Sequence, residues 1–309
     1  MDKRVILAGG SGLVGRGLAT ELRARNFAVT ILTRAPQSRA AGVQEIAWDG
    51  KNPGSWGEAL DGAEAMVNLA GHSVNCVHTP ENRRLIRESR IDSVRAISQA
   101  IRRATRPPRV LVQASAIGFY GNAGETPCDE SSPVGTGFLA ETCREWEAAL
   151  DANSLPATRC VTLRIGVVLG RDGGALPQLA RLVKLFLGGA AGDGRQVMSW
   201  IHQADLQRIF LTALENEDWR GPFNAVAPNP VTNAEFMREL RHALHRPWAP
   251  PAPAFAIRLL APLMGTDPSL AVEGQRVLPK RLLEAGFSFQ FPQVTEALQE
   301  LQCRAKDTK

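Results

Sequence analysis

Short hydrophobic runs alternate with amphipathic stretches over the first half of the chain. The runs are rich in Val, Ile, Leu and Thr, which is typical of buried strands. They cover residues 4–8, 28–33, 43–48, 65–69, 109–115 and 158–166. An amphipathic stretch over residues 138–153 predicts a helix before the last run. Strands and helices that alternate in this way build a parallel sheet with right-handed crossovers, so the predicted fold class is α/β, with a doubly wound parallel sheet.

The alternation ends after Gly166. Glycine-rich pieces at residues 170–174 and 188–194 and a proline-rich stretch at residues 247–253 separate shorter helical segments. We interpret the proline-rich stretch as an ordered linker. Two domains are therefore predicted. Residues 1–166 and about 199–226 form the sheet domain, and residues of about 167–198 and 227–302 form a smaller substrate-side domain at the C-terminal end.

Composition narrows the class of protein. The 309 residues are 44% hydrophobic and 22% charged, as in globular proteins, and no apolar run is long enough to span a bilayer. The first residues lead into a short apolar segment without a signal-peptide pattern, so a cytoplasmic location is expected. Five cysteines without a CxxC pair predict reduced thiols, and His242 and His245 lack further ligands nearby, so no metal is predicted.

Charge points to a small ligand. Lys and Arg number 36 against 31 Asp and Glu, and the net charge of +5 is spread along the chain among acidic residues. The basic runs lack an aromatic platform, which argues against nucleic acid. The expected partner is a small molecule whose identity the sequence does not reveal, with neither nucleic acid nor membrane, and the oligomeric state is not predicted.

A glycine-rich turn joins the first predicted strand to an amphipathic helix. The turn consists of Gly9, Gly10, Ser11, Gly12, Leu13, Val14 and Gly15. Glycine is needed where the backbone turns tightly, approaches a pyrophosphate and lets the helix pack closely on the strand, and the helix N-terminus offers N–H groups to phosphates. The strand–turn–helix context predicts a Rossmann domain that binds a dinucleotide at these residues. The alternative is a glycine turn without a ligand.

The end of the second predicted strand selects the dinucleotide. Thr33 and Arg34 occupy the place where a site selective for NAD carries an acidic residue on the ribose 2′-hydroxyl. A guanidinium there favours a 2′-phosphate through its charge and its forked donors, so the predicted cofactor is NADP(H). The alternative is that Arg34 only opens a solvated loop.

One charged residue interrupts an apolar helix stripe. Thr79 is placed to cap a helix that begins at Pro80. The buried stripe of this helix consists of Ile86, Arg90, Val94, Ile97 and Ile101. Because an isolated buried charge is costly, Arg90 is expected to face the cofactor or substrate, with a structural ion pair as the alternative.

Several motifs along nearly the whole chain belong together. They are Asn68-Leu69-Ala70-Gly71, Ser115-Ala116-Ile117-Gly118-Phe119-Tyr120-Gly121, Phe138-Leu139-Ala140-Glu141, Trp146-Glu147, Arg164-Ile165-Gly166-Val167, Ser199-Trp200-Ile201-His202 and Ala227-Pro228-Asn229-Pro230. With them the chain resembles the extended short-chain dehydrogenase/reductase superfamily. More closely it resembles an atypical epimerase-like branch, whose bacterial members often carry sugar-nucleotide epimerase or cell-division-inhibitor labels and share a characteristic C-terminal domain.

The resemblance implies roles for residues that pattern alone does not single out. Leu69 and Ala70 are expected along the cofactor near its adenosine side, and Val167 near its nicotinamide end. The resemblance also implies that the segment with His202 and Asp205 lines the substrate cleft, where Asp205 either caps the next helix or contacts the substrate. One departure from the branch is His72, at a position where many relatives are acidic.

The resemblance also exposes a missing catalytic pair. Short-chain dehydrogenases use a serine or threonine with a Tyr-x-x-x-Lys pair, in which the lysine lowers the tyrosine pKa for proton exchange. Tyr120 is the single tyrosine, and Gly124 stands four residues after it. Alignment of the predicted helix at residues 138–153 with the family's active-site helix places Leu139 at the tyrosine position and Cys143 at the lysine position.

Three residues are candidates to replace that pair. Ser115 ends the fifth predicted strand, where its hydroxyl could hold a substrate oxygen or belong to a plain turn. Cys143 is either a small buried side chain or a reactive thiolate, and Tyr120 either packs in its glycine-flanked loop or serves as a substitute acid. Two functions follow: an oxidoreductase or epimerase-like enzyme that binds NADP(H), or a catalytically silent NADPH-binding regulatory protein.

Overall fold

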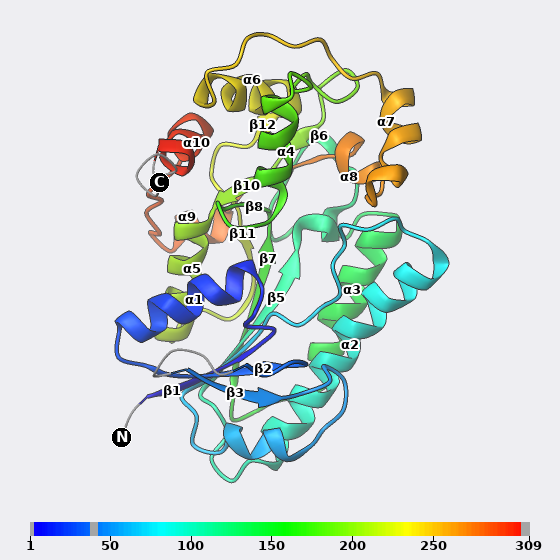
Figure 1. The fold of residues 1–309 in the computed structure, drawn as a ribbon. Helices are drawn as coiled ribbons and strands as arrows, with labels where there is room; N and C mark the ends of the chain where they lie inside the picture. Colours follow the sequence, from blue (N-terminus) through cyan, green and yellow to red (C-terminus); the bar gives the residue numbers. More distant parts are fainter. Residues whose placement is uncertain (1–2, 38–42, 304–309) are drawn as a thin grey trace.

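A parallel sheet forms the centre of the molecule. The structure, a computed structural model, describes residues 3–37 and 43–303. In these residues the main sheet has seven strands in the order β11-β7-β5-β4-β1-β2-β3, and every neighbouring pair is parallel. The strands are β1 (Arg4–Ala8), β2 (Ala28–Thr33), β3 (Val43–Ala47), β4 (Ala65–Asn68), β5 (Val110–Ala116), β7 (Arg159–Ile165) and β11 (Gly221–Ala225). The chain winds outward from β1 in both directions, which confirms the predicted doubly wound α/β fold (Figure 1).

Helices cover both faces of the sheet. One face carries α1 (Leu13–Ala24) and α5 (Gln203–Glu215), and the other carries α2 (Pro80–Arg103) and α3 (Phe138–Asp151), with the 3-10 helix η1 (Ser55–Leu60) beyond α2 (Figure 1). The side chains of β1 point alternately to the two faces of the sheet. Val5 and Leu7 pack in the hydrophobic core under α1 and α5, and Ile6 and Ala8 pack in the core under α2 and α3. Such double burial explains the continuous apolar runs in the sequence.

The predicted boundaries of these elements are close to the observed ones. The Thr79 side chain accepts a hydrogen bond from the backbone N–H of Asn82, and Pro80 opens α2 as predicted. The predicted strand at 109–115 is shifted by one residue, and the predicted helix at 138–153 ends two residues earlier, at Asp151. These differences are of the size by which frayed ends vary.

A second body of structure lies over the carboxyl ends of the strands. Its elements are β8 (Val167–Leu169) paired with β10 (Trp200–His202), β9 (Val197–Met198) paired with β12 (Val231–Thr232), β6 (Gly124–Cys128) paired with β13 (Gln275–Val277), and the helices α4 (Ala175–Lys184), α6 (Asn233–Ala243), α7 (Ala254–Leu260), α8 (Ser269–Val272) and α10 (Val294–Cys303). The short helix α9 (Lys280–Glu284) instead packs beside β11, where Arg281 donates to the Pro222 carbonyl. Two 3-10 helices, η2 (Ile117–Tyr120) and η3 (Pro262–Met264), complete the fold.

The hydrophobic clusters do not follow the predicted domain limits strictly. Trp200 packs with Leu169 and Phe236 in the cluster beside α4, α6 and α10, although residues of about 199–226 were predicted to belong to the sheet domain. Conversely, Leu282 of α9 joins the core between the sheet and α5. The division into two domains therefore stays a prediction.

The proline-rich stretch at residues 247–253 runs as a loop from α6 to α7 (Figure 1). Its end is fixed, because the Ala252 N–H donates to the Ala190 carbonyl at 2.8 Å and the Gly192 N–H donates to the Ala252 carbonyl at 2.8 Å. The stretch is therefore an ordered loop at this end, and its role as a linker stays a prediction.

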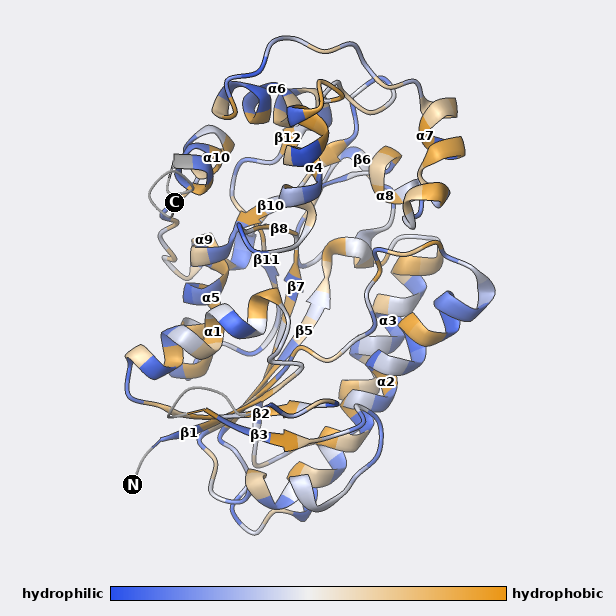
Figure 2. Cartoon of the chain, in the orientation of Figure 1, coloured by the Kyte–Doolittle hydropathy of each residue, from blue (hydrophilic) through white to orange (hydrophobic). Residues whose placement is uncertain are grey.

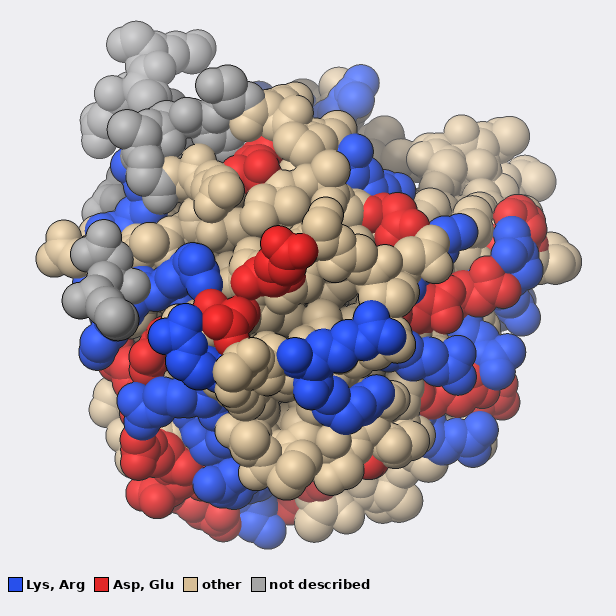
Figure 3. Space-filling view, turned by 90° about the horizontal axis from the view of Figure 1, so that it is seen from below, with Lys and Arg blue, Asp and Glu red and all other residues tan. Residues whose placement is uncertain are grey.

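Basic and acidic side chains are mixed on the surface. On the face in Figure 3, Lys and Arg groups lie beside Asp and Glu groups, as the interspersed charges in the sequence indicate. Within the described part of the chain, no helix is both long and apolar enough to cross a membrane.

Candidate functional site

The glycine turn packs against the end of β4. Gly9 has φ +72°, and a Cβ there would lie 2.8 Å from the Leu69 carbonyl carbon and 2.9 Å from the Ala70 nitrogen. A Cβ on Gly15 would lie 2.5 Å from the Gly10 Cα, so α1 packs directly on the turn. These positions require glycine, because any larger side chain would push the backbones apart. The turn and the end of β4 thus form one continuous surface, as a bound dinucleotide needs.

The first turn of α1 is left without a side-chain cap. Gly12 is the N-cap residue, no side chain caps the helix, and no acidic residue occupies its first turn. Ser11 is exposed, while Leu13 and Val14 are half-buried. The free backbone N–H groups and the positive end of the helix dipole suit a pyrophosphate. This end of α1 fits the predicted cofactor.

The loop after β8 reaches the same place. If Gly170 carried a Cβ, this atom would lie 3.3 Å from the Leu13 side chain. A Cβ on Gly174 would lie 3.2 Å from the same side chain. Val167, at the start of β8, is half-buried and donates its N–H to the Ser199 carbonyl at 2.9 Å. Its assigned contact with the nicotinamide end stays a prediction.

Arg34 lies at the end of β2, and it has no partner among the residues that the structure describes. Its side chain is exposed and forms no hydrogen bond or ion pair with any other residue that the structure describes. Thr33 next to it is held in the sheet, since its carbonyl accepts the Trp48 N–H at 2.9 Å. With respect to these residues, the guanidinium is open to a phosphate group.

Arg90 has no carboxylate partner among the described residues. Its Nη1 donates to the carbonyls of His72 and Ile86, both at 2.9 Å, and its guanidinium carbon lies 5.0 Å from the centre of the Trp146 ring. Burial lowers the pKa of this arginine, while the neighbouring Cys143 opposes the shift. The structural ion pair considered for Arg90 is therefore not formed, and a partly buried charge beside the loop after β4 is left for a ligand.

Cys143 is buried between α3 and η2. Its Sγ lies 3.7 Å from where a Cβ on Gly118 would be, and the side chain is only 5% exposed. Burial raises the pKa of the thiol to about 12, and the positive charge of Arg90 offsets this only in part. The burial of the side chain and its raised pKa favour the small buried side chain over the reactive thiolate.

Ser115 is bonded within the protein rather than exposed to a cleft. Its Oγ donates to Glu147 Oε1 at 2.6 Å, and the residue is 4% exposed. Glu147 in turn accepts from Arg164, whose Nε lies 2.9 Å from Oε1 and whose Nη2 lies 2.8 Å from Oε2. Burial opposes the charge of Arg164, but the hydrogen bonds and charge of Glu147 raise its pKa above the ordinary value.

Tyr120 belongs to the same network. Arg164 Nη1 donates to the Tyr120 hydroxyl at 2.9 Å, and the hydroxyl donates to Asn224 Oδ1 at 2.7 Å. Burial raises the pKa of Tyr120 to about 12, although the adjacent Arg164 opposes the shift. The phenol is therefore neutral and hydrogen-bonded on both sides, and it packs at the end of η2, a 3-10 helix where a loop was expected, with its ring edge to face with Phe119.

The structure thus connects two of the three predicted catalytic residues, Ser115 and Tyr120, through the Glu147–Arg164 pair. Sequence reasoning did not assign roles to Glu147, Arg164 and Asn224, which complete the network. A usable signal was present, because Arg164 is a charged residue in the interior of a predicted buried strand, next to Leu163 and Ile165.

His202 and Asp205 both make contacts within the protein. His202, not Asp205, caps α5: its Nδ1 accepts the Ala204 N–H at 3.1 Å, and its Nε2 lies 3.2 Å from Glu300 Oε2. Asp205 is fully buried and accepts the backbone N–H groups of Gln290 and Phe291 at 2.8 and 2.9 Å. Asp205 thus does not cap α5, and both its oxygens hold the C-terminal segment, which disfavours the alternative of a substrate contact.

Comparison with known families agrees with this geometry. Residues 5–225 match the NAD dependent epimerase/dehydratase family, and residues 252–301 match a domain of unknown function, DUF1731. The chain belongs to the NAD dependent epimerase/dehydratase family, which confirms the predicted resemblance.

Named relatives extend over almost the whole chain. The chain is 40% identical over 308 residues to the chloroplastic epimerase family protein SDR39U1 homolog of Arabidopsis thaliana, covering 96% of this chain and 86% of the relative. It is 35% identical over 305 residues to the human epimerase family protein SDR39U1, covering 96% and 99%. The crystal structure of human SDR39U1 (isoform 2) with NADPH is similar at a TM-score of 0.86 and 33% identity, covering 97% and 99%. A UDP-N-acetylglucosamine 4-epimerase from Bacillus cereus, at 15% identity and a TM-score of 0.77, covering 100% and 98%, shares the fold.

Proposed function

We propose that this protein binds NADP(H) across the carboxyl ends of β1, β2 and β4, and that it acts as a cofactor-binding regulatory protein without the proton transfer of ordinary short-chain dehydrogenases. The glycine turn and the uncapped end of α1 would hold the pyrophosphate. Arg34 would hold the 2′-phosphate, and Arg90 would lie farther along the dinucleotide. The human relative that was crystallised with NADPH supports the same cofactor.

One observation carries the regulatory part of the proposal. The three side chains predicted to exchange a proton are all buried. The hydroxyls of Ser115 and Tyr120 already donate hydrogen bonds, to Glu147 and Asn224. The third, Cys143, is held in its neutral form because burial raises its pKa to about 12. Bound NADPH supplies a hydride, but carbonyl reduction also needs a proton donor within reach of the substrate oxygen. The described groups do not provide a free one at these positions.

A second function has a specific observation in its favour. The hydrogen bond from Ser115 Oγ to Glu147 Oε1 is 2.6 Å long, and Glu147 is the kind of carboxylate that can accept a proton from a serine. If Ser115 turns toward a bound substrate, the pair could pass a proton between substrate and carboxylate. The protein would then be an oxidoreductase or an epimerase-like enzyme.

The experiment separates the two functions. Calorimetric titration with NADPH and NADH measures binding, and the loss of NADPH absorbance with a panel of aldehydes, ketones and sugar nucleotides measures chemistry. The regulatory proposal expects tight NADPH binding with no oxidation above the protein-free rate. Turnover that Ser115→Ala abolishes, with NADPH binding kept, would instead establish the enzyme. Absence of NADPH binding by the folded protein would refute both.

A further inference from the structure

Residues 254–272 carry large apolar side chains on the outside of the molecule. Phe255 is 74% exposed, Leu259 is 70%, Leu263 is 81% and Met264 is 68%. The segment comprises α7, η3 and α8, and Figure 2 shows α7 as a mostly hydrophobic helix at the rim of the molecule. None of its three short helices has a buried residue. Few packing contacts therefore hold this segment in place.

Both ends of the segment are fixed to the body of the protein. On one side, the Ala252 N–H donates to the Ala190 carbonyl. On the other side, Gln196 Nε2 donates to the Ala271 carbonyl at 2.7 Å, and the Gly124 N–H donates to the Gly274 carbonyl at 3.0 Å. The segment is thus a strap with anchored ends and a weakly packed middle.

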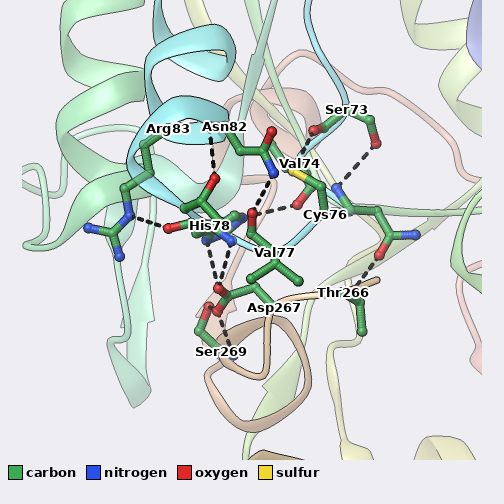
Figure 4. A network of polar contacts seen from close by, with 12 residues as sticks. Ser73, Val74, Cys76, Val77, His78, Asn82, Arg83, Thr266, Asp267 and Ser269 are labelled. Carbon is green, nitrogen blue, oxygen red and sulfur yellow. Dashed lines mark hydrogen bonds and ion pairs between the residues drawn. The ribbon is translucent and has the colours of Figure 1, made fainter. Parts of the chain in front are cut away.

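The middle of the strap is held by polar contacts with the loop before α2 (Figure 4). The backbone N–H of His78 donates to Asp267 Oδ2 at 3.0 Å, and His78 Nδ1 lies 3.6 Å from the same oxygen. Thr266 Oγ1 donates to Asn75 Oδ1 at 2.7 Å. Asp267 also accepts the N–H and hydroxyl of Ser269, which begins α8. We call these contacts of Asp267 and Thr266 with residues 75 and 78 the latch.

The loop that receives the latch continues from the candidate cofactor site. Leu69 and Ala70, which contact the glycine turn, precede it directly. Arg90 binds the His72 carbonyl at 2.9 Å, and Ser89 Oγ accepts the His72 N–H at 2.9 Å. A change in the position of Arg90 or of residues 69–72 would therefore reach Asn75 and His78 within a few residues of chain.

We propose that residues 254–272 form a strap that opens and closes on this edge of the molecule, and that the latch couples its position to the occupancy of the dinucleotide site. This rests on the proposed function. When NADP(H) engages Arg90 and the end of β4, the loop at residues 71–79 is fixed and the latch holds the strap closed. Without the dinucleotide the loop is freer, the latch breaks more often, and the weakly packed strap moves away.

The first arm of the test measures the latch without cofactor. Asp267→Ala removes the acceptor of the His78 N–H, and Thr266→Val removes the donor to Asn75 while it keeps the side-chain shape. Asp218→Ala is the control, because Asp218 is an exposed aspartate near the start of β11 and away from the strap. By hydrogen exchange of the full-length protein, amides of residues 254–272 should exchange about tenfold faster in Asp267→Ala than in the control, as the loss of hydrogen bonds to a charged group implies.

The second arm adds NADPH. In the unmodified protein NADPH should slow exchange across residues 254–272, and stopped-flow fluorescence should show NADPH leaving Asp267→Ala and Thr266→Val severalfold faster than it leaves Asp218→Ala. Unchanged exchange in the strap of both latch variants would overturn the latch. NADPH binding that leaves strap exchange and release rates unaltered would overturn the coupling. If NADPH fails to bind at all, the proposed function fails and the coupling fails with it, while the first arm still decides the latch.

Discussion

Arg164 of β7 and Glu147 of α3 form a two-point ion pair, with Nε 2.9 Å from Oε1 and Nη2 2.8 Å from Oε2. Their side chains are only 6% and 15% exposed. The guanidinium carbon of Arg164 also lies 3.5 Å from the centre of the Phe119 ring, so the pair joins β7, α3 and the 3-10 helix η2 after β5. Because Ser115 and Tyr120 both bond to this pair, it fixes the two hydroxyls of the candidate site.

Removal of one partner should therefore be costly. Glu147→Ala leaves Arg164 as a buried charge without its carboxylate, and breaking such a pair costs about 3–5 kcal/mol. We expect a fall in the free energy of unfolding of this size, measured by urea denaturation. Glu81→Ala is the control, because Glu81 pairs with Arg84 in an exposed position of α2 and its loss should leave stability unchanged. Equal stabilities of the two variants would contradict the buried pair.

Tyr120 offers a second test, because it is the single tyrosine of the chain. Burial raises its pKa to about 12, so the folded protein should show no tyrosinate absorbance at pH 10 and should titrate about two units higher. The unfolded chain binds this proton more weakly, with a pKa near 10. Folding stability from this group is therefore complete below about pH 10 and is lost as the pH rises toward 12.

The measurement is an ultraviolet difference titration of the native and the urea-unfolded protein. Tyr120→Phe should remove the tyrosinate absorbance in both the native and the unfolded state. This control shows that the absorbance does not come from tryptophan. A native titration at the same pH as the unfolded one would mean that the phenol is open to solvent and free to exchange a proton.

The sequence predicted the sheet and the cofactor loop well, for a physical reason. The strands of a doubly wound sheet are buried on both faces, so each is a continuous apolar run that stands out from its surroundings, as in β1 and β4. Gly9 and Gly15 are equally readable, because each lies where a Cβ would collide with backbone. At these positions the residue type favoured by the local sequence pattern is also the one that the tertiary packing requires.

The buried network could not be predicted in the same way. Ser115, Glu147 and Asn224 come from three separate elements, and only packing shows that the serine hydroxyl faces α3. Asp205 accepts from the backbone N–H groups of Gln290 and Phe291, which lie 85 and 86 residues away in the chain. Local spacing carries no information on such contacts, so a helix-start aspartate was assigned to a cap or a substrate.

Arg34 should set the preference for NADPH over NADH. Its guanidinium is exposed and has no partner among the described residues, so it is open to the 2′-phosphate. Arg34→Ala should weaken NADPH binding by about 1.5–3 kcal/mol, the scale of a hydrogen bond to a charged group, and should leave NADH binding unchanged. Arg34→Lys keeps the charge without the fork and should recover part of the loss.

Calorimetry with both dinucleotides supplies the comparison, and NADH acts as the internal control for folding. If the unmodified protein binds the two with equal affinity, the assignment of NADP(H) to this residue is wrong.

Substitution of Arg90 tests whether its charge beside the end of β4 binds the dinucleotide. Arg90→Ala should weaken NADPH binding about tenfold or more, because its guanidinium meets no carboxylate in the described part of the chain and a bound anion would supply one. The matched control is Arg95→Ala in the same helix, where the side chain is exposed and lies 3.7 Å from Asp92. Calorimetry gives the affinity and thermal unfolding without cofactor gives the stability. A large fall in melting temperature with unchanged NADPH affinity would show instead that Arg90 serves only to tie the His72 carbonyl to α2.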